Sequence, residues 1–369
     1  MANGQNNFDA DFVDISSYEY GAYAQATKRI MNNKLKLSAS FRADKSKNYD
    51  LQMSPRISGV YKHKDHHFRL AAQSAFRSPT LQNQFLLIDL GPIILSGNLN
   101  GSGNLSQDGS PLVFYTLESV QDFTAMYDSV DANNNYIGEV IPGLLDTITL
   151  APIKPEQVKT IEAGYKGILF SGLYVDLNVY YSQYASFIGD IRVARPDGNG
   201  VAGEESGMDA ILTKAYQPYQ IPVNAKEEVI TYGGGIGLAY YFGKIMAKTN
   251  YTYSLMDTAG LTDPILPGFN TPKHKCNVGL VGTRVWKELG FSVNYKWVEG
   301  FRWESSFGDG DVPSYTVLDG QVNYHFKDLF STLRIGASNM LDNRHVEAYG
   351  SPIIGRLFYA SWTFKFDEF

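Results

Sequence analysis

The sequence predicts an all-β fold, an antiparallel transmembrane β-barrel, and three observations support this prediction. Segments of about ten residues alternate between apolar and polar side chains, which is the pattern of a membrane-spanning strand. The connections between these segments are alternately short and long. No run of about eighteen apolar residues occurs, so a membrane-spanning helix is excluded.

The last predicted strand shows the alternation most clearly. Its apolar face carries Phe358, Ala360, Trp362, Phe364 and Phe366, and its other face carries Leu357, Tyr359, Ser361, Thr363 and Lys365. An apolar face toward lipid and a polar face toward the interior are what a barrel strand requires. An edge strand of a soluble sandwich would alternate in the same way, so this strand alone does not decide between the two folds.

The same alternation predicts about thirteen strands along the chain. Each predicted strand has the nine to eleven residues, roughly, that a tilted membrane strand needs. The strands are expected to begin near Tyr18, Lys34, Leu51, His66, Glu156, Gly172, Glu227, Lys244, Asn270, Trp286, Pro313, Leu329 and Gly355.

The connections favour the barrel over the sandwich. The short connections are 31–33, 62–65, 170–171, 242–243, 284–285 and 326–328. The long connections are 79–155, 190–226, 257–269, 301–312 and 342–354, and 44–50 is a shorter member of this second set. Strict alternation of this kind is typical of barrels with short periplasmic turns and long extracellular loops. We therefore expect 79–155 and 190–226 to be long extracellular loops.

An odd number of strands cannot close a bacterial barrel of the usual kind, which has an even number. An open sheet would also leave unpaired backbone groups in lipid. We therefore expect residues 18–369 to be the C-terminal part of a longer barrel, and residues 1–17 to be the remainder of a preceding extracellular loop. The first residues contain no basic-then-apolar signal segment.

Several short phrases occur along the chain in a definite order and spacing. They are Phe76-Arg77-Ser78-Pro79-Thr80-Leu81-Gln82, Ile153-Lys154-Pro155-Glu156-Gln157-Val158, Glu162-Ala163-Gly164-Tyr165-Lys166-Gly167, Pro267-Gly268-Phe269-Asn270-Thr271-Pro272-Lys273-His274-Lys275, Tyr315-Thr316-Val317-Leu318-Asp319 and Asn339-Met340-Leu341-Asp342-Asn343. Taken together, they resemble the C-terminal barrel of TonB-dependent outer-membrane receptors, particularly those of Bacteroidota. The last phrase has Met-Leu where the family has Leu-Phe.

This resemblance implies a location in the Gram-negative outer membrane and a barrel of about 22 strands closed by an N-terminal plug. It implies import of a scarce nutrient, such as a ferric siderophore, haem, cobalamin, an oligosaccharide or a peptide. The energy would come through TonB, acting on a plug that has no counterpart in this sequence. The implied partners are outer-membrane lipid, TonB, the nutrient and a surface lipoprotein.

Composition and motifs argue against several other classes of function. The net charge of −6 argues against a nucleic-acid partner. The single cysteine, Cys276, cannot form an internal disulfide. No nucleophile elbow, phosphate loop or paired catalytic acid is recognisable, so we expect no enzyme activity and no cofactor. A passive porin-like channel and a surface-binding protein or adhesin on a barrel scaffold remain the alternatives.

The predicted inner face is rich in basic residues, which either pair with a plug or attract an anionic solute. The basic residues are Arg29, Lys34, Lys36, Arg42, Arg69, Arg77, Lys166, Lys248, Lys296, Arg334 and Lys365, and the acidic ones are Glu162, Asp176 and Asp319. By contrast, the segment 79–153 has no Lys or Arg. Its many apolar residues predict a folded lid rather than disorder.

Three residues are the candidates for solute binding. Arg77 lies where a strand enters the longest loop, and Trp303 and Phe307 lie in a later loop. Exposed loop aromatics can stack on a ligand, whereas Trp297 fits the interfacial girdle better.

A weaker candidate is a calcium site in the longest loop. Asp128, Asp131, Asn133, Asn135 and Glu139 offer oxygen ligands. Their spacing departs from the EF-hand, because Tyr136 stands where glycine is needed. We expect no other metal site.

Overall fold

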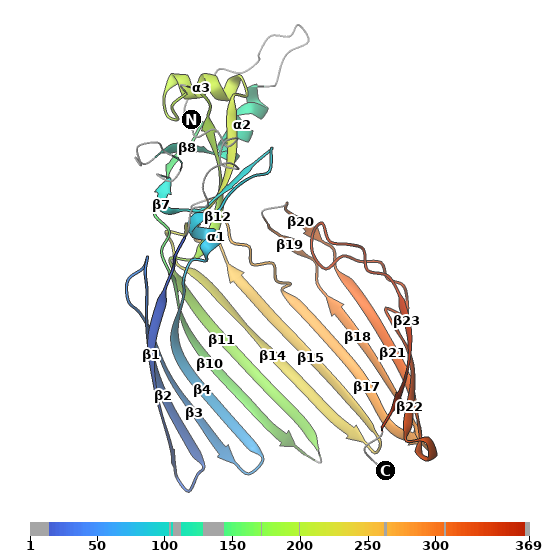
Figure 1. Cartoon of the computed structure of the whole chain (residues 1–369). Helices are drawn as coiled ribbons and strands as arrows, with labels where there is room; N and C mark the ends of the chain where they lie inside the picture. Colours follow the sequence, from blue (N-terminus) through green and yellow to red (C-terminus); the bar gives the residue numbers. More distant parts are fainter. Residues whose placement is uncertain are drawn as a thin grey trace.

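The computed structural model describes residues 15–102, 105, 112–127, 144–170, 172–198, 200–261, 264–305 and 308–365. Its main body is one sheet of thirteen strands, in the order β1-β2-β3-β4-β10-β11-β14-β15-β17-β18-β21-β22-β23 (Figure 1). The strands are β1 (Glu19–Ile30), β2 (Leu35–Ser46), β3 (Gln52–His63), β4 (His66–Arg77), β10 (Glu156–Leu169), β11 (Leu173–Ala185), β14 (Val229–Phe242), β15 (Ile245–Asp257), β17 (His274–Trp286), β18 (Leu289–Val298), β21 (Tyr315–Phe326), β22 (Ser331–Ser338) and β23 (Leu357–Phe364).

All thirteen predicted strands are present, and each pairs antiparallel with its neighbour in the sheet. The prediction of a turn at 284–285 is wrong. Strand β17 continues to Trp286, its pairing with β18 shifts between Gly282 and Trp286, and the turn falls at Lys287 and Glu288. A β-bulge adds residues to one strand and so moves the turn, which an alternation pattern does not register.

The six short turns lie at one end of the sheet, as the alternation predicts (Figure 1). Asn32, Lys64, Phe242, Lys287 and Lys327 lie in or beside these turns, and Asp309 and Tyr349 lie in the connections at the other end. The other residues assigned to that end, Asn104, Asn199 and Thr262, lie outside the described residues. A short 3-10 turn, η3 (Lys327–Leu329), forms the last of the six.

The register confirms the predicted division into two faces. Side chains of directly opposed residues lie on the same face of a sheet. Gly164 is opposite Arg69, Lys166 is opposite Asp176, and Asn277 is opposite Lys296. Continued across all thirteen strands, this pairing places on one polar face Arg29, Lys36, Arg42, Arg69, Arg77, Lys166, Lys248, Lys296, Arg334, Glu162, Asp176 and Asp319.

The opposite face of the sheet is apolar and exposed. Ile57, Leu70 and Trp362 are 62%, 61% and 56% exposed, respectively. An apolar band of this extent on a protein surface marks contact with lipid or with another protein. Among the residues that the structure describes, no helix combines the length and apolarity needed to cross a membrane.

The long connections fold into a second sheet of seven strands at the other end from the turns (Figure 1). The connection between β4 and β10 contributes α1 (Leu81–Phe85), β5 (Leu87–Asp89), β6 (Ile94–Ser96), β7 (Leu99–Ser102), β8 (Val113–Thr116), α2 (Leu117–Tyr127) and β9 (Thr147–Thr149). The next long connections contribute β12 (Ile188–Pro196), α3 (Glu205–Leu212), β13 (Tyr216–Asn224) and β16 (Ile265–Leu266). We call this assembly the loop module.

The loop module has its own hydrophobic core. Phe114, Ile191, Val193 and Ile221 are almost fully buried within it. The sheet order β5-β6-β13-β12-β8-β9, with β16 paired to β12, interleaves strands from three connections. The described part of 79–155 is therefore folded, as predicted, but its shared sheet with the segment around 190–226 was not predicted.

The topology predicts which residues a membrane-impermeant maleimide reaches on intact cells. In a Cys276→Ser background, Tyr349→Cys should be labelled and Lys64→Cys should not, because the two positions lie at opposite ends of the sheet. Both should be labelled after the membrane is permeabilised. Labelling of Lys64→Cys on intact cells would reverse the proposed orientation.

The loop module should depend on its core. Phe114→Ala should cost about 3–5 kcal/mol of local stability, because it leaves a cavity at a fully buried site. Chymotrypsin should then cut the module on intact cells while the sheet persists as a heat-modifiable band. Phe170→Ala is the matched control, since Phe170 is 93% exposed in a turn. Equal cleavage in both variants would contradict this account.

Candidate functional site on the loop side of the sheet

The loop module is joined to the main sheet through a buried carboxylate. Glu156, the first residue of β10, has a side chain that is only 7% exposed. Its Oε2 accepts hydrogen bonds from Arg77 Nη2 and from the backbone N–H of Ile188, both at 2.8 Å. Arg77 Nη2 also donates to the Ile188 carbonyl at 3.2 Å. The candidate Arg77 therefore holds the start of the second long connection against the sheet.

Asn98 joins the two longest connections to each other. Its Nδ2 donates to the carbonyls of Ala151 and Pro222, each at 2.9 Å. Asn98 is fully buried, so these bonds form away from water, where an unmade hydrogen bond is costly. Asn98 thus joins the longest connection both to the C-terminal end of that connection, at Ala151, and to strand β13, at Pro222.

An ion pair links the loop module to a separate hairpin, β19 (Phe301–Trp303) and β20 (Gly310–Val312). Arg192 of β12 donates from Nη1 and Nη2 to the two carboxylate oxygens of Asp309, at 2.5 and 3.0 Å. Arg192 Nη2 also donates to the Ser305 carbonyl at 3.3 Å. Burial by itself would raise the pKa of Asp309, but the Arg192 hydrogen bonds and charge outweigh it and hold that pKa below its usual value.

Asp190 lies on β12, the strand that carries Arg192, and Gln220 holds its carboxylate. Gln220 of β13 donates from Nε2 to Asp190 at 2.9 Å and accepts from Arg192 Nε at 3.3 Å. Burial raises the pKa of Asp190, and the Gln220 hydrogen bond and the Arg192 charge offset this only in part. Asp190, Gln220, Arg192 and Asp309 thus form one hydrogen-bonded chain across the loop side.

Trp303, the second candidate, lies within strand β19 and is half-buried, whereas the sequence predicted an exposed aromatic in a loop. Its ring lies 6.4 Å from that of Phe301. The next residue, Glu304, joins the hairpin to the connection after β15 through Asn270 and the Gly268 N–H. A hollow of about 200 Å³ lies at this junction, lined by Met256, Phe269, Asn270, Phe301, Arg302 and Glu304, among others.

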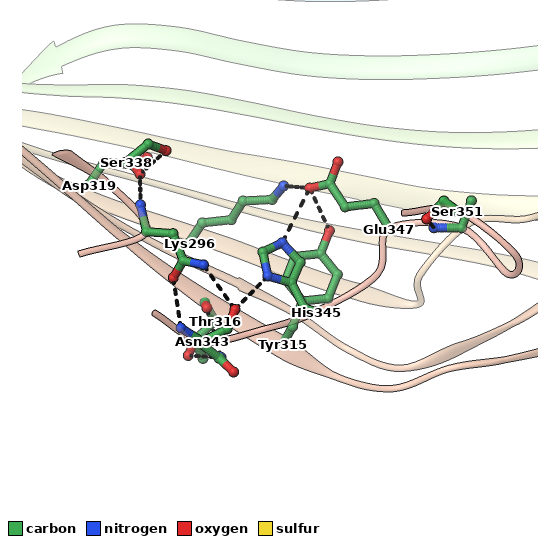
Figure 2. Close-up of polar contacts among 11 residues, drawn as sticks. Lys296, Tyr315, Thr316, Asp319, Ser338, Asn343, His345, Glu347 and Ser351 are labelled. Carbon is green, nitrogen blue, oxygen red and sulfur yellow. Dashed lines mark hydrogen bonds and ion pairs between the residues drawn. The ribbon is translucent and has the colours of Figure 1, made fainter. Parts of the chain in front are cut away.

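The last long connection, between β22 and β23, is held by the contacts in Figure 2. Glu347 Oε1 accepts from Lys296 Nζ at 2.9 Å and from the Tyr315 hydroxyl at 3.2 Å. The His345 ring stacks on Tyr315, with ring centres 4.4 Å apart. The Lys296 hydrogen bond and charge lower the pKa of Glu347, despite the opposing effect of burial.

The same connection begins with a turn fixed by side chains (Figure 2). Asp319 Oδ1 accepts from Ser338 Oγ and the Asn339 N–H, and Asn343 Nδ2 donates to the Thr316 carbonyl. Asn339 and Asn343 also contact each other, since Asn339 Nδ2 donates to the Asn343 carbonyl at 2.9 Å. They have a structural role in turning the chain.

The remaining candidates receive no structural placement. Phe307, Asp128, Asp131, Asn133, Asn135 and Glu139 lie outside the described residues. Within the described residues, no group of three or more His, Cys, Asp or Glu side chains could hold a metal ion.

The residues that sequence reasoning missed are Glu156, Arg192, Asp309 and Glu347. Each is charged and lies in or next to a long connection, and its partner comes from a distant part of the chain. The one local signal was Arg192, which interrupts the apolar series Ile191, Val193 and Ala194. A charge at such a position indicates a partner nearby, but the sequence does not name it.

Asp309→Asn should loosen the hairpin β19–β20. Leaving the Arg192 guanidinium without its carboxylate should cost about 1–3 kcal/mol, measured as faster hydrogen–deuterium exchange in the hairpin. Asp311→Asn is the matched control, because the Asp311–Arg302 pair is long, at 3.6 Å, and exposed. Equal exchange in both variants would mean that the Arg192 pair does not hold the hairpin.

The Arg192–Asp309 ion pair predicts that the stability of the hairpin β19–β20 depends on pH. Because the pKa of Asp309 is lowered in the folded protein, its stabilisation is fully present above the ordinary aspartate pKa of about 3.9. It is lost as the pH falls through the lower folded value. Hairpin exchange in the wild type should therefore approach that of Asp309→Asn only below about pH 4. Convergence of the two proteins at neutral pH would contradict the assignment.

Solved structures with the same fold include siderophore receptors and a copper transporter. The match to the siderophore receptor PirA from Acinetobacter baumannii covers 94% of this chain and 45% of the PirA chain, with a TM-score of 0.58 and 16% sequence identity. The match to a variant of the ferric enterobactin receptor PfeA from Pseudomonas aeruginosa covers 94% of this chain and 44% of the PfeA chain, with a TM-score of 0.59 and 14% sequence identity. The match to the copper transporter OprC covers 94% of this chain and 47% of the OprC chain, with a TM-score of 0.57 and 14% sequence identity.

The chain therefore spans a little under half the length of these proteins, and the likeness shows a shared fold. No curated protein matches the sequence. A family model described as TonB-dependent receptor-like β-barrel matches residues 2–340. This match confirms the predicted resemblance to the barrel of TonB-dependent receptors. The chain belongs to the TonB-dependent receptor-like β-barrel family and is an outer-membrane β-barrel protein.

Proposed function

We propose that this chain supplies barrel wall and extracellular loops to an active outer-membrane importer, which uses energy passed through TonB. The observation that carries this proposal is the interlocking of the long connections. Contacts of Glu156, Asn98, Arg192 and Glu304 join them into one body at one end of the polar face. A gated receptor needs an ordered assembly of this kind, whereas a passive channel needs an unobstructed entrance.

The proposed cargo is a scarce nutrient of the kind that this family imports: a siderophore, cobalamin, an oligosaccharide or a peptide. Among the structural neighbours are siderophore receptors and a copper transporter. Members of the family are transport receptors rather than enzymes, and no enzyme activity is proposed. A plug that contacts TonB and a surface lipoprotein are the proposed protein partners.

Arg77, Trp303 and Phe307 are the proposed solute contacts. Phe301 lines the hollow beside β19, and the centre of the Trp303 ring lies 6.4 Å from that of Phe301. Arg77 is 56% exposed even though Glu156 engages it, so its guanidinium retains a face for a ligand. Aromatic rings add flat apolar area at little cost in conformational entropy.

Transport distinguishes the proposal from its alternatives. Cells that express the full-length receptor should accumulate a radiolabelled nutrient from a panel of ferric siderophore, cobalamin, oligosaccharide and peptide, and deletion of TonB should abolish accumulation. Uptake that persists without TonB would identify a passive channel. Surface binding without uptake in either strain would identify a binding protein or adhesin.

Replacing Trp303 or Phe307 by Ala should weaken solute binding by roughly 1–3 kcal/mol if each is a binding hot spot. Arg77→Ala should also weaken it, and Arg77→Lys shows how much depends on charge alone. Trp286→Ala is the control, since Trp286 is 65% exposed at the opposite end of the sheet. Affinity is measured in the full-length receptor at matched surface levels. Unchanged affinity in all three Ala variants would place the solute elsewhere.

A further inference from the structure

Three neighbouring short turns carry a cluster of charged side chains at the end of the sheet opposite the loop module. The turns join β14 to β15, β17 to β18 and β21 to β22, and these six strands are consecutive in the sheet. Four of the side chains are basic and two are acidic, so the cluster is positive although the whole chain carries a net charge of −6. We call this cluster the basic rim, and it comprises Lys244, Arg284, Lys287, Glu288, Lys327 and Asp328.

Polar contacts join the three turns into one surface. Glu288 Oε1 lies 2.6 Å from Lys327 Nζ, and Glu288 Oε2 lies 3.2 Å from Arg284 Nε. Lys244 Nζ donates to the Arg284 carbonyl at 2.8 Å. The Glu288 side chain carries one negative charge and serves two cations, so it leaves the rim positive.

Lys244 and Lys287 supply the excess charge. Both are exposed, and among the residues that the structure describes neither forms an ion pair with a carboxylate. The Lys287 ammonium lies 5.2 Å from the centre of the Trp286 ring. Attraction to the face of the indole orients this ammonium without neutralising its charge. The charge of Lys287 is therefore available to an anion from outside the chain.

The rim lies at the edge of the apolar face of the sheet. The register sets Trp286 opposite Leu289 and Leu289 opposite Tyr324, so these three side chains share that face. Trp286 and Phe242 are 65% and 63% exposed, and each comes one or two residues before a lysine of the rim. Exposed aromatic rings are enriched where the apolar core of a membrane meets its headgroups. The cations of the rim therefore lie at the level of the headgroups.

We propose that the basic rim binds the phosphate of an anionic phospholipid, in the membrane leaflet at the turn end of the barrel. The exposed ammonium groups complement the charge of the phosphate, and Trp286 and Phe242 offer apolar contact to the glycerol and the upper acyl chains. A phospholipid carries both chemistries in this order, whereas a soluble anion would gain nothing from the aromatic rings.

The orientation of the barrel favours a phospholipid over lipopolysaccharide, which also carries phosphates. Lipopolysaccharide occupies the extracellular leaflet, and in the orientation expected from the connection lengths the short turns lie at the periplasmic leaflet. The inference rests on the outer-membrane location of the family and does not require the proposed import function.

The first experiment identifies the occupant within the outer membrane. The photo-crosslinking residue p-benzoylphenylalanine replaces Trp286 in the full-length receptor, which keeps an aromatic ring beside Lys287. After irradiation, mass spectrometry should show phospholipid adducts in which phosphatidylglycerol or cardiolipin is enriched relative to the bulk membrane. Lys287→Gln in the same background should return the adducts to the bulk ratio. The same residue in place of Tyr349, at the opposite end of the sheet, should give no such enrichment.

The second experiment titrates the purified full-length receptor with dioleoyl phosphatidylglycerol, and native mass spectrometry reports the bound lipid. Lys287→Gln should lower the affinity about fivefold, which is the contribution expected of one basic residue near an anionic lipid surface. Lys287→Arg should retain the affinity. Dioleoyl phosphatidylethanolamine, with the same chains and no net charge, should bind more weakly and respond little to these changes. Lys64→Gln is the matched control, because it removes one charge from an exposed turn that β10 and β11 separate from the rim.

The two experiments decide the proposal together. Anionic enrichment that Lys287→Gln removes, with a loss of affinity that Lys64→Gln does not share, supports it. Phospholipid adducts in the bulk ratio would show ordinary membrane contact, and adducts with lipopolysaccharide or a protein would identify a different occupant. Either result would overturn the proposal, as would equal losses of affinity in Lys64→Gln and Lys287→Gln. Heat-modifiable migration confirms that each variant assembles.

Discussion

The pairing of backbone groups within the membrane is the constraint on which the rest of this structure depends. Hydrocarbon offers no hydrogen-bond partner, so an unpaired N–H or C=O group costs several kcal/mol there. The uninterrupted antiparallel ladder from β1 to β23 meets this requirement over thirteen strands. The same ladder fixes the register, and the register sends every second side chain to the polar face. Lys248, Gly279 and Asn294, which lie on three neighbouring strands, share one surface for this reason.

Beyond the strand ends this constraint is relaxed, and side-chain contacts help to hold the long connections in place. The long connections pair strands with one another in the loop module, and a few charged contacts join that module to its surroundings. Glu156 fixes its base, Arg192 connects it to the hairpin β19–β20, and Glu347 fixes the last connection. Such contacts are partly shielded from water, where charged hydrogen bonds are stronger than on an open surface. They make the loop side an ordered assembly.

Sequence reasoning succeeded where a local pattern carries the information. A period of two predicted thirteen strands, and the alternating connection lengths predicted which ends of the strands share a side. It failed at the bulge of β17, because extra residues break the period without leaving a recognisable signal. For the candidate site, the sequence proposed Arg77 and Trp303 by position and chemistry, and their part in binding stays a prediction. It did not identify Glu156, which is 79 residues from Arg77, or Asp309, which is 117 residues from Arg192.

The sequence by itself determined the fold class, the two faces of the sheet and the family, because these depend on residue types at short, regular spacing. Only the tertiary structure decided that three long connections share one sheet, that Arg77 is engaged by a buried carboxylate, and that Arg192 pairs with Asp309. These features depend on which distant segments meet. That choice is made by burial of apolar side chains such as Phe114 and Ile221 and by the pairing of charges, and neither is encoded at any fixed separation along the chain.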